Sequence, residues 1–140
     1  MKVGDVWSKD MLRKKKTSIS EIEILKNRII ESIKLLASEG EVQLSCFPDF
    51  VCKGDEIANS LGDWLLMYKN IGASEAANAF LPDELKQIIS IDEYISELEP
   101  GDFSDEAIIN SYKWRIIREK ANAVLYLLKV DYSLPDKRSV

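Results

Sequence analysis

The 140-residue sequence contains no histidine. This absence excludes catalysis by Ser-His-Asp or Cys-His groups, zinc sites with histidine ligands, and the Glu-x-x-His di-iron centres found in helical bundles. A large share of common enzyme chemistry is therefore closed to the chain.

Cysteine is almost as scarce. The only two, Cys46 and Cys52, are separated by five residues. This spacing is neither the C-x-x-C of metal and redox sites nor part of a multi-cysteine framework. We expect both to be reduced and buried as small apolar side chains.

Long apolar runs are missing as well. No stretch approaches the roughly 20 apolar residues of a membrane span, and the first residues lack the apolar run of a secretory signal peptide. We therefore expect no membrane partner and a cytoplasmic location. With 6 Gly, 4 Pro, 46% hydrophobic and 31% charged residues, the composition is typical of a globular, helix-leaning protein with one core.

Apolar residues recur at steps of three and four along most of the chain. This periodicity predicts an all-α fold, a helical bundle of four to six helices. Ser18 and Glu21 have capping-box spacing and predict a first helix that ends near Gly40. Ser90 and Glu93 share that spacing and suggest a break. The later helices are predicted over residues 55–70, 74–80, 82–98 and 104–128. The last has so wide an apolar arc that we expect it to be central and well buried.

The segment after the first predicted helix leaves another element open. Val42, Leu44 and Cys46 alternate with polar residues, as in a small β element near residues 42–51. Pro48 argues against a helix there. The expected organisation is a basic N-terminal arm over residues 1–17, a single helical domain over 18–130 and a C-terminal tail over 131–140.

Charge is sorted by position along the chain. Residues 39–106 hold 16 acidic and 3 basic side chains, whereas residues 1–38 hold 5 and 9, and residues 107–140 hold 3 and 7. Such a block is either a solvated acidic face or a surface that meets a basic partner.

Half of these acids have a structural interpretation. Four Asp-Glu pairs stand where helices are predicted to begin or restart, and helix N-termini favour negative charge by about 0.3–1 kcal/mol per group. The pairs are Asp55-Glu56, Asp83-Glu84, Asp92-Glu93 and Asp105-Glu106. Caps and turns account for only some of the other eight, which are Glu39, Glu41, Asp49, Asp63, Glu75, Glu97, Glu99 and Asp102.

Two lysines of the last predicted helix, Lys113 and Lys120, fall inside its apolar arc. Either their long stems carry the ammonium groups past the core to solvent, or those groups pair with acids of the middle segment. In the second case, part of the charge sorting is internal electrostatics and not a binding surface.

The enzymes best suited to a histidine-free acidic bundle are the magnesium-dependent nucleotide pyrophosphohydrolases, in which carboxylates one helical turn apart share a metal. No Glu-x-x-Glu occurs here. Glu99-x-x-Asp102 contains Pro100 and Gly101, which should break the helix that would align the two acids. We therefore expect no catalytic residue, no metal site and no cofactor.

Nucleic-acid binding would need an extended basic surface. The basic run of residues 13–16 is short, and the net charge of the chain is −5. We expect a solvated arm there and no direct nucleic-acid partner.

Phe47-Pro48-Asp49-Phe50 has two interpretations. Both Phe side chains plug the core beneath a loop, or they lie beside Asp49 as a binding edge, because interfaces combine aromatic anchors with a polar rim.

The same segment, extended to Val51, is followed by Asp55-Glu56-Ile57-Ala58 and by Asp63-Trp64. In this combination the chain resembles small bacterial immunity proteins that accompany polymorphic or contact-dependent growth-inhibition toxins. The resemblance implies a cytoplasmic protein that binds and blocks one cognate toxin domain, often a basic nuclease, without catalysis of its own. It carries over no functional residues, because such families diverge at their binding faces.

The working hypothesis is a non-catalytic inhibitor of a basic protein toxin, since an acidic surface speeds association with such a partner. Its contacts are expected from acids not needed at helix starts, chiefly Glu39, Glu41, Asp49, Glu97, Glu99 and Asp102. The alternative is a helical adaptor or regulatory subunit that forms homodimers; the sequence leaves the oligomeric state open. The acids outside the helix-start pairs form two groups, one from Glu39 to Asp63 and one from Glu75 to Asp102. If the two groups converge in space they form one surface, and if not the charge is scattered.

Overall fold

The computed structural model describes residues 10–70 and 79–130, with side chains for residues 21–70 and 79–130. Within this part the chain forms six α-helices and one 3-10 turn, and no strand. The elements are α1 (Asp10–Ala37), α2 (Gly40–Ser45), α3 (Lys53–Asn70), α5 (Pro82–Ser96), η1 (Pro100–Phe103, the 3-10 turn), α6 (Asp105–Asn110) and α7 (Tyr112–Leu128). The predicted all-α helical bundle is confirmed.

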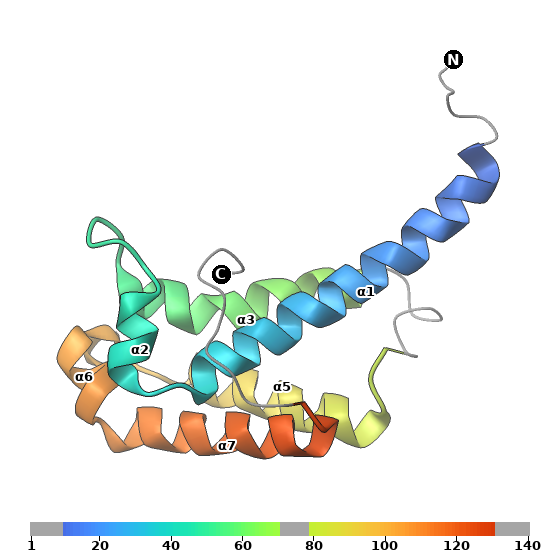
Figure 1. The fold of residues 1–140 in the computed structure, drawn as a ribbon. Helices are drawn as coiled ribbons and strands as arrows, with labels where there is room; N and C mark the ends of the chain where they lie inside the picture. The colour runs from blue at the N-terminus through green and yellow to red at the C-terminus, as the bar shows by residue number, and fades with distance from the viewer. Residues whose placement is uncertain (1–9, 71–78, 131–140) are drawn as a thin grey trace.

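Four long helices build the bundle, and two short helices close one end of it. α1 packs against both α3 and α7, and α5 packs mainly against α7. Figure 1 shows α2 and α6 side by side at the end where α1 finishes. α1 and α3 run antiparallel, because the hydroxyls of Ser32 and Ser60 lie 2.7 Å apart while Arg28 lies 5.7 Å from the Trp64 ring centroid. Among the described helices, none is long and apolar enough to cross a membrane.

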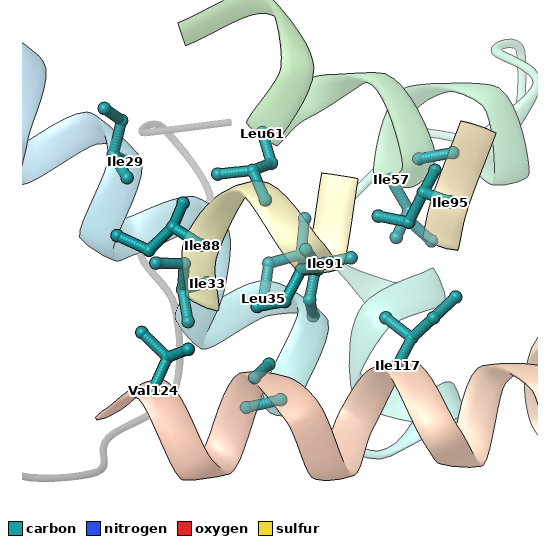
Figure 2. Close-up of a cluster of buried hydrophobic side chains, with 14 of the residues drawn as sticks. Ile29, Ile33, Leu35, Ile57, Leu61, Ile88, Ile91, Ile95, Ile117 and Val124 are labelled. Carbon is teal, nitrogen blue, oxygen red and sulfur yellow. The ribbon is translucent and has the colours of Figure 1, made fainter. Parts of the chain in front are cut away.

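A single apolar core fills the space between the long helices, and most of its side chains come from the predicted stripes. Figure 2 shows Ile29, Ile33 and Leu35 of α1, Ile57 and Leu61 of α3, Ile88, Ile91 and Ile95 of α5, and Ile117 and Val124 of α7. The bulkiest fully buried side chain is Trp114 of α7, whose Nε1 donates to the Asp102 carbonyl at 2.8 Å. Trp114 therefore joins the core to η1.

The prediction of a β element near residues 42–51 is wrong. The helix α2 occupies Gly40–Ser45, and residues 46–51 form turns. The buried positions are Gly40, Gln43 and Cys46, three residues apart, which is a helical period. Because Gln43 is polar, the sequence did not indicate that its position is buried, and the helical period was missed. The Gln43 Nε2 donates to the carbonyls of Leu35 at 3.0 Å and Leu36 at 3.2 Å, and so ties α2 to the end of α1.

Several predicted boundaries also differ from the structure. α1 begins at Asp10, so residues 10–17 of the expected arm are helical. α5 continues through Ser90 without a break. The last predicted helix is two helices, because Ser111 separates α6 from α7 and its hydroxyl accepts from the Lys113 N–H at 3.1 Å. Most of the helix predicted over residues 74–80, and the predicted tail over 131–140, lie outside the described residues.

The last helix packs against α1, α5 and α6, as expected of a central helix, but the prediction that it is well buried is wrong. α7 buries one stripe of side chains but leaves Tyr112 58% and Tyr126 88% exposed. Its apolar arc therefore extends beyond the surface that the bundle covers.

Candidate functional site

Acids from both groups meet at one end of the bundle, although Asp63 lies further along α3 and Glu75 lies outside the described residues. This end is formed by α2, the first turn of α3, η1 and α6, which contact one another although their residues are far apart in the sequence (Figure 1). The segments 39–56 and 97–106 that form it contain ten carboxylates and one basic residue, Lys53. We call these ten the acidic end: Glu39, Glu41, Asp49, Asp55, Glu56, Glu97, Glu99, Asp102, Asp105 and Glu106.

Two glycines allow these segments to approach closely. A Cβ on Gly40 would lie 2.8 Å from the Ile109 Cα, and a Cβ on Gly54 would lie 2.8 Å from the Phe103 carbonyl carbon and overlap its oxygen. α2 is therefore in backbone contact with α6, and the start of α3 with η1. These two backbone contacts bring the acids near Gly40 and Gly54 in the sequence to the same end of the bundle as the acids near Phe103 and Ile109.

Asp102, one of the six predicted contact acids, is held by internal interactions. Its Oδ2 accepts from the Glu99 N–H at 2.7 Å and from the Lys113 Nζ at 2.9 Å, and its side chain is only 16% exposed. The Glu99 N–H, and then Lys113, lower the pKa of the Asp102 carboxyl, and Asp102 raises the pKa of Lys113. Asp102 therefore stabilises the turn and is not free for a partner. The same contacts occupy the second carboxylate of the Glu99-x-x-Asp102 motif.

Asp49 differs from Asp102 because its side chain is fully exposed. It pairs with Lys53, four residues further along the chain, at 2.9 Å, and this hydrogen bond lowers the pKa of the Asp49 carboxyl. The pair sits on the surface, where salt screens it and where such pairs contribute little to stability.

The remaining eight acids are exposed, and in the described part of the chain none of them has an ion-pair partner. Four belong to the predicted contact set, namely Glu39, Glu41, Glu97 and Glu99. The other four occupy the first turns of α3 and α6, as predicted for helix-start acids: Asp55, Glu56, Asp105 and Glu106. Because both helices begin at this end, their structural acids add to the same negative surface.

The pair Asp92-Glu93 does not follow that pattern. It lies near the C-terminal end of α5, where no helix begins, so the helix-start interpretation is wrong for these two residues. Asp83-Glu84 does lie in the first turn of α5, and Glu84 Oε1 accepts from the Leu81 N–H at 2.8 Å.

Each of the two interpretations of the aromatic loop holds for one of its Phe side chains. Phe47 packs against the core, whereas Phe50 is 88% exposed beside the exposed Asp49. Ile109 and Tyr112 are exposed as well, and Ile109 adjoins Gly40, between Glu39 and Glu41. The acidic end thus carries apolar and aromatic side chains among its carboxylates.

The two cysteines also differ in burial. Cys46 is buried as expected, but Cys52 is exposed, so the prediction that both are buried is wrong. Cys52 immediately precedes the first turn of α3, where the chain leaves the exposed loop.

Lys113 and Lys120 supply a matched test of internal pairing. Lys113 pairs with Asp102, whereas Lys120 donates to the Ser90 hydroxyl at 3.3 Å and lies 5.9 Å from the Tyr94 ring centroid, with no acid partner in the described structure. Lys113→Met is therefore expected to lower the thermal unfolding midpoint at pH 7, and Lys120→Met to leave it unchanged or raise it. Equal effects of the two substitutions would contradict internal pairing.

The pH dependence of this effect has a defined sign. Because the folded-state pKa of Asp102 is lowered, its contribution is complete above the ordinary carboxyl pKa of 3.8 and is lost as the pH falls through the lower folded-state value. The difference between wild type and Lys113→Met should shrink below that pH. Thermal unfolding between pH 2 and 7 measures it, with Lys120→Met as the flat control.

Comparison of the chain with protein families, curated proteins and solved structures gives no significant match.

Proposed function

We propose that this protein is a non-catalytic immunity protein that binds a cognate basic toxin domain through its acidic end. The observation that carries the proposal is the convergence of two acid-rich segments, 39–56 and 97–106, on one end of the bundle. A surface of one charge sign speeds encounter with a partner of the opposite sign. The resemblance of residues 47–64 to immunity proteins supplies the class of partner.

The side chains at the acidic end suit a protein partner. Protein interfaces combine aromatic or aliphatic anchors with a polar rim. Phe50, Ile109 and Tyr112 are exposed apolar groups at this end, and the unpaired carboxylates lie around Gly40 and η1. A basic nuclease domain, whose own nucleic-acid site is cationic, matches that combination.

The test compares two sets of four Glu→Gln substitutions, each removing four exposed charges. The first set neutralises the acidic end at Glu39, Glu41, Glu97 and Glu99. The control set lies elsewhere on the surface, at Glu21, Glu23, Glu93 and Glu119. The proposal predicts that a toxin is encoded immediately upstream, and the partner in this test is the domain of that toxin; absence of such a gene would favour the adaptor. The readouts are growth protection and the association rate at several salt concentrations.

The acidic-end variant should associate about tenfold more slowly, or slower still, at low salt, and the difference should narrow as salt screens the charges. The control variant should match the wild type within about twofold. Equal slowing by both sets would show an effect of net charge and contradict this binding surface. Failure of the protein to protect growth would contradict the function. A homodimeric mass in light scattering that the acidic-end substitutions convert to a monomer would also contradict it and would favour an adaptor.

A further inference from the structure

A cleft of about 250 Å³ lies between α3 and α5, next to η1. Gly62 and Asp92 are neighbours in its lining, and Ile95, Leu98 and Phe103 form its apolar wall. Ligand pockets for small molecules usually occupy about 300–1,000 Å³. The cleft is smaller than that range and matches a single side chain.

Asp92 gives the cleft its charge. Its side chain is partly buried, and in the described part of the chain it has no ion pair or hydrogen bond. A Cβ on Gly62 would lie 3.0 Å from Asp92 Oδ1, so the absent side chain is what leaves room beside the carboxylate. Burial raises the pKa of Asp92, against a smaller opposing effect of Lys69 and reinforced by Glu93. The carboxylate thus loses hydration without gaining a partner.

The other polar side chains of the cleft are Asn59, whose amide both donates and accepts hydrogen bonds, and two groups that can only accept them. Asp63 contributes a second carboxylate at the exposed rim. The Ser96 hydroxyl already donates its proton to the Glu93 carbonyl at 2.7 Å, so its oxygen is left to accept. No basic side chain lines the cleft in the described structure. A ligand that donates several hydrogen bonds and carries positive charge complements this lining.

We propose that the cleft binds the guanidinium group of an arginine side chain presented by the basic partner. A guanidinium offers five donors in a planar fork that matches a carboxylate, and it is more weakly hydrated than an ammonium group. The aliphatic stem of the arginine packs on the apolar wall formed by Ile95, Leu98 and Phe103. The source of the arginine rests on the proposed function; the chemistry of the cleft does not.

The experiment uses the whole chain and no toxin. Acetyl-arginine amide is titrated into isotopically labelled protein, and amide chemical shifts are followed in the two-dimensional NMR spectrum. Acetyl-citrulline amide, which has the same shape without the charge, is the ligand control. The variants are Asp92→Asn, which removes the charge, and Gly62→Ala, which places a methyl group against it. Glu93→Gln removes the adjacent charge of the same helix, outside the cleft lining, and is the matched control.

Saturable shifts centred on Gly62, Ser96 and Phe103 are expected with the arginine probe. Asp92→Asn and Gly62→Ala should each weaken binding at least fivefold, whereas Glu93→Gln should leave it within twofold and the citrulline probe should not bind. Absence of saturable shifts, equal binding of citrulline, or equal effects of Asp92→Asn and Glu93→Gln would overturn the assignment. Because no toxin is present, such a failure is distinct from a failure of toxin binding by the acidic end.

Discussion

Trp114→Ala is expected to lower the free energy of unfolding by about 3–5 kcal/mol, the range for removal of a large aromatic side chain from a core. Trp114 has no exposed surface, and it also hydrogen-bonds to η1, through the Asp102 carbonyl. Its loss opens a cavity between the long helices and frees η1. Urea denaturation followed by circular dichroism measures the change.

Two further substitutions separate the causes. Trp114→Phe keeps most of the ring and removes the donor, so it should cost less than the alanine variant. Tyr126→Ala changes an aromatic residue of the same helix that is 88% exposed, and it should stay within about 0.5 kcal/mol of the wild type. A loss below about 1 kcal/mol for Trp114→Ala would contradict the central place of this side chain in the core.

Gly54→Ala is expected to destabilise the protein by about 1–3 kcal/mol, as overpacking does, although alanine is the better helix former by about 1 kcal/mol. The reason is that the new Cβ would overlap the Phe103 carbonyl, which is backbone and has no rotamer with which to yield. α3 and η1 must then move apart. Because acids on both sides of this contact form the acidic end, the partner binding proposed for that end should weaken along with stability.

Gly101→Ala is the matched control for that substitution. A Cβ on Gly101 meets nothing within 4 Å, although it lies two residues from Phe103 in the same turn. It should change the unfolding free energy by no more than about 0.5 kcal/mol. If the two alanine variants unfold at the same urea concentration, the close approach of α3 and η1 does not require glycine at position 54.

The helices could be predicted where the buried face is apolar. The stripes of α1, α3 and α5 gave both the helical period and most of the core, because apolar residues occupy nearly every buried position. α2 was missed because a buried Gln43 and Gly40 carry its inward face. The Ser90–Glu93 spacing misled for a different reason: the same two residue types fit an unbroken helix, and Ser90 instead accepts from Lys120.

The candidate site could be predicted only in composition. The sequence contains the carboxylates, and Pro100 and Gly101 do form a turn in which Asp102 caps the Glu99 N–H. The convergence of residues 39–56 with 97–106 depends on backbone contacts at Gly40 and Gly54, between positions some fifty to seventy residues apart in the chain. No local pattern encodes such pairings. The unpaired state of Asp92 likewise depends on its neighbours in space.

The division of the acidic end between two distant segments sets the order in which the surface can be made during protein synthesis. Five of its ten carboxylates lie at or after residue 97, and the tryptophan that anchors η1 lies later still. A chain emerging from the ribosome therefore carries half of the charge without the geometry that gathers it. Because domains fold as units once their long-range contacts are available, the surface is completed only after residue 114 has been synthesised. Truncation before residue 114 should leave an acidic polypeptide and no assembled acidic end.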